Sequence, residues 1–161
     1  MEIERADLLQ SLRRHREFLR FTTRDLTDEQ AGQCTTVSAL CLGGLIKHTA
    51  SVEAAWMRFA VGGAEAMVDD SGRDRDSEFA MLDGETLAGV LEDYARVAAR
   101  TDEQVETLDL DAAHRLPVAP WFAEEDWTVR RALLHIIAET SQHAGHADII
   151  REALDGSRTM G

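Results

Sequence analysis

Four long stretches of this sequence carry apolar residues at the spacing of an α-helix, and this periodicity restricts the fold more than any other feature. In the first stretch, for example, Leu8, Leu12 and Leu19 fall on one helical face between charged residues. Both prolines, Pro117 and Pro120, lie in the connection before the last stretch, where they interrupt no helix. The pattern predicts an all-α four-helix bundle, with helices near residues 4–21, 38–61, 85–108 and 128–154.

Length and charge limit the organisation and the partners. The 161 residues suit a single domain covering residues 1–161. A net charge of −13 disfavours nucleic acid and anionic membranes as partners, because both are negative. Two cysteines are too few for a disulfide framework, and no basic and apolar leader follows Met1. We therefore expect a cytoplasmic protein without a secretory signal.

The last stretch places four polar residues on one face. His135, Glu139, His143 and His146 are spaced four, four and three residues apart, so they share one side of a helix that is otherwise apolar. A carboxylate and several imidazoles inside a bundle are unfavourable unless each finds a partner. A divalent metal ion is such a partner, and helix bundles use this spacing to bind metals.

A further histidine lies on the apolar face of the second stretch. His48 supplies a ligand from a facing helix, so that His48, Glu139 and His143 form a site with two histidines, one carboxylate and open positions. A single histidine on an apolar face is more often a hydrogen-bonded core residue, but the clustering favours a metal site. His15 and His114 lack such neighbours and are expected outside the site.

The residues around these ligands resemble a known family. Residues 42–48, 127–140 and 143–148 are similar to the DinB-like (DinB/YfiT) metalloenzymes, in the branch of the mycothiol-dependent S-transferases and the N-terminal domain of mycothiol-dependent maleylpyruvate isomerase. The resemblance implies a four-helix bundle with zinc or nickel on His48, Glu139 and His143. Glu139 replaces the commoner histidine, as it does in the isomerase branch. That isomerase carries a further C-terminal domain, so its reaction is not expected here.

The resemblance and the metal site together predict a thiol S-transferase. A metal with open positions holds a thiol as its thiolate, which then attacks a small electrophile. Mycothiol or a similar thiol is the implied cosubstrate. His146 and His135 are candidate catalytic residues, which either orient a ligand or move a proton. Trp121, Phe122 and Trp127 either line a substrate pocket or close the end of the bundle.

Two other functions fit the same residues. The metal could activate water instead of a thiol, which would make the protein a hydrolase. Alternatively, the chain could be a non-catalytic metal-binding module that acts by dimerisation or through a protein partner. Leu133, Leu134 and Ile137 lie on the side of the last stretch away from the histidines. Apolar residues there predict a homodimer.

Overall fold

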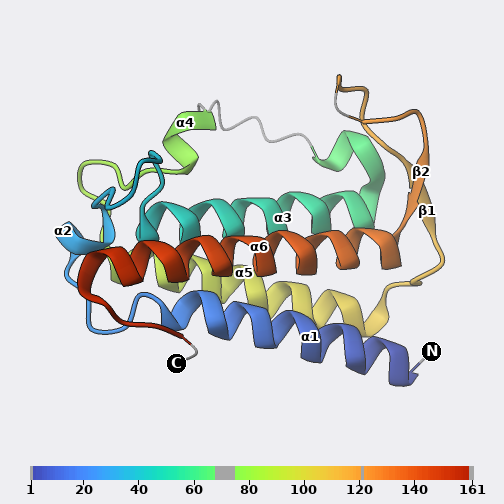
Figure 1. Ribbon diagram of the computed structural model, residues 1–161. Helices are drawn as coiled ribbons and strands as arrows, with labels where there is room; N and C mark the ends of the chain where they lie inside the picture. The colour runs from blue at the N-terminus through green and yellow to red at the C-terminus, as the bar shows by residue number, and fades with distance from the viewer. Residues whose placement is uncertain (1, 68–74, 121, 160–161) are drawn as a thin grey trace.

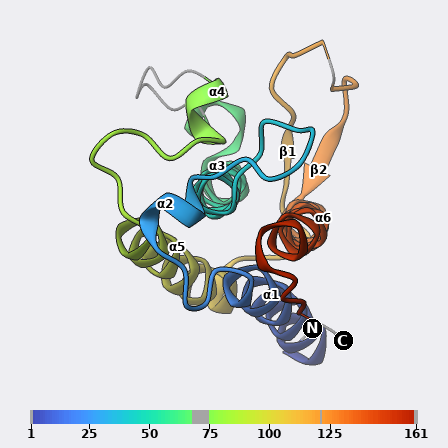
Figure 2. The same cartoon turned by 60° about the vertical axis from the view of Figure 1, so that its left-hand side comes forward.

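Four long helices form the bundle in the computed structural model, which describes residues 2–67, 75–120 and 122–159. Helix α6 packs against both α1 and α3, and α3 also packs against α5 (Figures 1 and 2). The all-α bundle predicted from the sequence is therefore confirmed. The long helices are α1 (Glu2–Phe21), α3 (Leu42–Met67), α5 (Leu87–Thr107) and α6 (Val129–Asp155).

Four short elements lie in the connections. They are α2 (Asp28–Ala31), α4 (Arg75–Glu78), β1 (Ala113–Arg115) and β2 (Asp126–Thr128). Strands β1 and β2 pair antiparallel, and the backbone N–H of Val129 donates to the carbonyl of Ala112 at 2.9 Å. This pairing leads directly into α6 and satisfies one of the free N–H groups at its start. The sequence did not predict the strands, because three residues are too few to show an alternating pattern.

Local capping signals set the ends of α2 and α6. The Thr27 side chain and the Gln30 side chain form a reciprocal capping box around α2. Thr128 caps α6, where its hydroxyl accepts a hydrogen bond from the Arg131 N–H, and Gly156 ends the helix with φ of 78°. Each of these residues is of a type that favours its capping position, so the ends of α2 and α6 follow from the local sequence.

The second long helix differs from its predicted range of residues 38–61. The hydroxyl of Ser38 accepts a backbone hydrogen bond from Leu40, which holds this part of the chain in a turn. Helix α3 starts at Leu42 instead, after Cys41, whose Sγ accepts from the Gly44 N–H. At its other end, Gly63 has φ of 75°, which interrupts the helix, and the chain is helical again from beyond this kink to Met67. Glycine adopts this conformation without the strain that a side chain would add.

The apolar residues on the side of α6 away from the histidines are buried to different extents. Leu133 is buried in the core with Leu12 and Trp56, so it is not available to a partner. Leu134 is 45% exposed, and Ile137 is partly buried against the same core. Helix α1 packs against α6, and the homodimer predicted from these residues stays a prediction. None of the helices in the described parts of the chain is long and apolar enough to cross a membrane.

Candidate metal site

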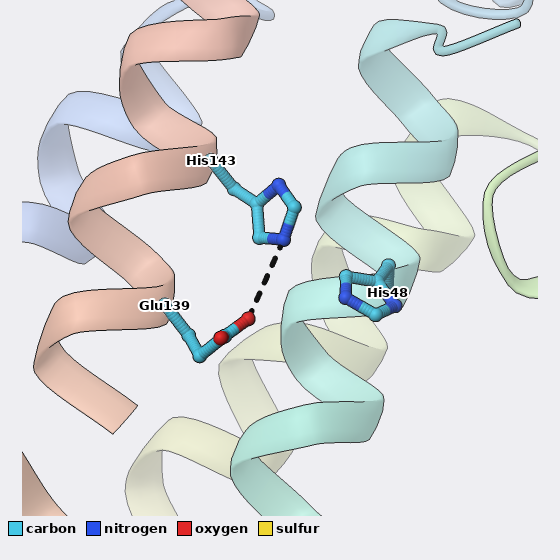
Figure 3. A group of neighbouring side chains, drawn as sticks. All are labelled: His48, Glu139 and His143. Carbon is cyan, nitrogen blue, oxygen red and sulfur yellow. Dashed lines mark ion pairs between the residues drawn. The ribbon is translucent and has the colours of Figure 1, made fainter. Parts of the chain in front are cut away.

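Three side chains from two packed helices converge at the middle of the bundle. His48 comes from α3, and Glu139 and His143 come from successive turns of α6 (Figure 3). One donor atom of each lies within 4.8 Å of the others. The His143 Nε2 is 3.6 Å from the Glu139 Oε2, and the rings of His48 and His143 lie 4.9 Å apart, nearly perpendicular.

The chemistry of these donors fits a divalent metal ion. Two imidazoles and one carboxylate are the ligand set of many zinc and transition-metal sites that keep open positions. The contacts between the three groups are longer than direct hydrogen bonds, and both rings are nearly buried, at 9% exposure each. Buried donors that converge without closing on one another are suited to a bound cation. Their role as metal ligands stays a prediction.

Each donor on α6 has one of the other predicted histidines beside it. The Nδ1 of His146 lies 3.3 Å from the Nδ1 of His143. The Nε2 of His135 lies 3.8 Å from the Glu139 Oε1. His146 therefore contacts the side of the His143 ring that faces away from Glu139. This is where a residue that orients a metal ligand is usually found.

Burial favours the neutral forms of His48 and His135. Desolvation lowers the pKa of His48, and the nearby His143 lowers it further. Desolvation also lowers the pKa of His135. For Glu139, the interaction with the neighbouring His143 lowers the pKa, although burial opposes this shift. The neutral form of His48 and the ionised form of Glu139 are thus favoured, and these are the forms that bind a metal ion.

Aromatic side chains surround His135. Trp56 and Trp127 stack with ring centroids 4.9 Å apart, and Trp56 lies 4.6 Å from the His135 ring. Phe122 packs edge-on against Trp56 at 5.8 Å. The predicted wall residues Phe122 and Trp127 therefore meet beside the histidine next to Glu139, while the predicted Trp121 lies outside the described residues. Trp56 completes this group from α3, and the periodicity of its helix did not indicate that role.

The sequence also missed two residues that contact His48. The Glu78 Oε2 lies 3.5 Å from the His48 Nδ1, and the Phe79 ring stacks on His48 at a centroid distance of 3.9 Å. They come from α4 and the residue after it, where no periodic pattern marks them. The glycine pair at the start of α3 is a weak sequence signal that another backbone segment packs closely there. A Cβ on Gly44 would lie 1.8 Å from the Phe79 carbonyl oxygen.

Two other histidines and a cysteine lie elsewhere. His15 is on α1 beside Phe18, and His114 is in β1 beside Phe59. Neither belongs to the group of converging donors among the described residues. Cys41 is buried at the start of α3, where its thiol accepts the capping hydrogen bond.

Comparisons with known proteins agree with this architecture. A crystal structure titled as the conserved protein of locus from Enterococcus faecalis superposes with a TM-score of 0.68, at 14% identity, over 93% of this chain and 96% of that chain. At this identity the likeness shows the fold alone. No curated protein matches the sequence. The family described as mycothiol-S-transferase matches residues 7–156, nearly the whole chain. The chain therefore belongs to the mycothiol-S-transferase family.

Proposed function

We propose that this protein is a metal-dependent S-transferase that joins mycothiol or a similar thiol to a small electrophile. The observation that carries the proposal is the convergence of His48, Glu139 and His143 within 4.8 Å, in a chain of this family. These three residues would hold a divalent ion such as zinc or nickel. When bound, such an ion lowers the pKa of a thiol and keeps it as the nucleophilic thiolate.

The remaining residues act on the proton and on the electrophile. The thiol loses its proton, its sulfur forms a bond to the electrophilic carbon, and the bond from that carbon to the leaving group breaks, with its electron pair leaving on that group. His135 is the candidate acceptor of the thiol proton, because burial keeps its ring neutral beside Glu139. His146 orients His143 through their Nδ1 contact.

The aromatic group beside His135 supports an apolar electrophile. Trp56, Phe122 and Trp127 present ring surfaces next to the site. Such surfaces bind the apolar part of a small molecule and exclude water from the thiolate. An electrophile with a hydrophobic substituent is therefore the preferred substrate class.

Metal analysis with a transfer assay tests the proposal. The purified protein should contain about one divalent ion per chain and should conjugate mycothiol to an aromatic electrophile such as a chlorodinitrobenzene. His48→Gln and His143→Gln should lose both the metal and the turnover. His15→Gln, a matched change on α1, should keep both. Wild-type protein that neither retains nor binds divalent metal would refute the proposal.

The same assay separates the other two functions. Turnover of the electrophile at equal rate without any thiol would indicate a hydrolase that activates water. Metal binding without turnover of either kind would indicate a non-catalytic metal-binding module. A single domain over residues 1–161, a homodimer and a cytoplasmic location also stay predictions.

A further inference from the structure

We propose that Glu78 positions His48 for metal binding by contacting the Nδ1 atom of its ring. The segment after Glu78 packs across the start of α3 and fixes the position of this carboxylate. The inference rests on the proposed function, because His48 is one of the three proposed ligands. It adds a positioning residue from α4, an element that contributes none of the three donors.

The segment that follows α4 is held against α3 by several independent contacts. Gly44 leaves no room for a side chain there, since an added Cβ would lie 1.8 Å from the Phe79 carbonyl oxygen. The Lys47 Nζ donates to the Ala80 carbonyl at 3.0 Å and pairs with the Glu85 carboxylate at 2.8 Å. These contacts fix the backbone directly after Glu78. The position of its carboxylate is therefore set by the fold.

Glu78 faces the ring nitrogen that points away from the other donors. The His48 Nδ1 is buried and makes no hydrogen bond within the described residues, and the Glu78 Oε2 lies 3.5 Å from it. Figure 3 shows the other ring nitrogen of His48 on the side of Glu139 and His143. A carboxylate at Nδ1 favours the tautomer that carries its proton there. The Nε2 lone pair is then free for the metal.

Two further contacts hold Glu78 and His48 in this arrangement. The Ser51 hydroxyl donates to the Glu78 Oε1 at 3.3 Å, one turn beyond His48 on α3. Phe79 stacks on the face of the imidazole with an interplanar angle of 24°. Glu78 thus restrains the imidazole within its plane, and Phe79 restrains it perpendicular to that plane.

Glu78 acts through His48 and is not a fourth ligand. The group of donors that lie within 4.8 Å of one another contains His48, Glu139 and His143 but not Glu78. His143 has an equivalent neighbour in His146, which contacts its Nδ1. Both imidazole ligands would therefore be oriented through their Nδ1 atoms, His48 by a carboxylate and His143 by a second imidazole.

Two measurements on Glu78→Gln test the proposal. Long-range ¹⁵N–¹H NMR of the metal-free protein should show the His48 proton on Nδ1 in the wild type and a mixture of tautomers in the variant. Titration with Co²⁺ should show an affinity about 10- to 100-fold weaker than wild type, the usual effect of losing an orienting partner. The Co²⁺ absorption bands should keep their position, because the ligands do not change. Ser51→Ala should weaken Co²⁺ binding by a smaller factor.

Glu152→Gln is the matched control, because it removes the same charge from an exposed ion pair with Arg158 on α6. It should leave the affinity and the His48 tautomer unchanged. Unchanged affinity and tautomer in Glu78→Gln would overturn the inference, and so would altered Co²⁺ bands, which would make Glu78 a ligand. Failure of the wild type to bind Co²⁺ would refute the proposed function instead, and the tautomer measurement would still report on Glu78 alone.

Discussion

The bundle encloses two polar clusters that share helix α3 and differ in how their members meet. In the first, the Arg16 guanidinium donates to both oxygens of Glu53, at 3.0 and 2.5 Å, and to Asp102 at 2.7 Å. In the second, His48, Glu139 and His143 approach one another without a direct bond to fill the space between them. The first cluster is complete by itself. The second has the donors for a group that the chain does not supply.

The difference follows from the chemistry of the residues. A guanidinium and a carboxylate match each other in charge and in hydrogen-bond geometry, so they pair directly. Each neutral imidazole has one N–H and one lone pair, so two rings and a carboxylate bring more lone pairs together than N–H groups to satisfy them. A cation resolves that arrangement. We therefore expect the first cluster to stabilise the fold and the second to bind the proposed metal ion.

The largest expected effect is on the stability contributed by the first cluster, Arg16, Glu53 and Asp102. Arg16→Met should lower the free energy of unfolding by about 3–5 kcal/mol, because Glu53 is fully buried and would lose its counter-charge. Urea unfolding followed by circular dichroism measures this difference. Arg13→Met is the control, since the mostly exposed Arg13 also pairs with Asp102 and should contribute less than about 1 kcal/mol.

A double variant sharpens the same prediction. Arg16→Met combined with Glu53→Leu removes both buried charges, so it should be less destabilised than Arg16→Met alone. A double variant as unstable as the sum of the two single variants would contradict the assignment of this cluster as one paired unit.

The next effect is on the second cluster, the open cluster of His48, Glu139 and His143, where the free energy of unfolding should depend on bound metal. Zinc at a hundred times its dissociation constant should raise the free energy of unfolding by about 2.7 kcal/mol. His143→Gln should remove this increase because it removes a donor. Thermal unfolding with zinc and with a chelator measures both states. An equal zinc response in His143→Gln and in the His15→Gln control would argue against the site.

A smaller effect is the pH dependence of the metal-free protein. The pKa values of His48 and His135 are lowered in the folded state, so the unfolded chain binds more protons just below its own histidine pKa of about 6.5. Stability should therefore fall as the pH decreases from about 6.5 through the folded pKa values. Urea unfolding between pH 8 and pH 5 measures the slope, which His135→Gln should reduce. A metal-free stability that rises toward pH 5 would contradict the assigned burial.

The smallest effect concerns the helix that carries two of the donors. Gly145 lies within α6 between His143 and His146, and an added Cβ would meet no atom within 4 Å. Gly145→Ala should stabilise the protein by about 0.5–1 kcal/mol through the helix preference of alanine. Metal affinity should not change, because α6 is already regular there. A loss of affinity, measured by Co²⁺ titration, would show that the open cluster needs flexibility in α6.

The helices were the most predictable part of the fold because their signals are local. Apolar spacing located all four, and Thr128 and Gly156 marked both ends of α6. The start of α3 was predicted too early, because Ser38 holds a turn before the helix. Side-chain hydrogen bonds of this kind compete with helix formation, and composition alone does not reveal which one prevails.

The candidate site was predictable only in part. Residues on one helix have fixed relative positions, so the shared face of His135, Glu139, His143 and His146 followed from their spacing. Glu78 and Phe79 could not be found in this way. They reach His48 only because the chain after α4 crosses α3 at its glycines.

The sequence by itself determined four amphipathic helices and a polar face on the last of them, because backbone hydrogen bonds within a helix fix which residues lie together. Only the tertiary structure decided that His48 faces Glu139 and His143, and that Glu78 contacts the other side of its ring. Those relations depend on how helices rotate as they pack and on where a connection crosses them. Long-range packing decides both, and no local spacing in the sequence encodes them.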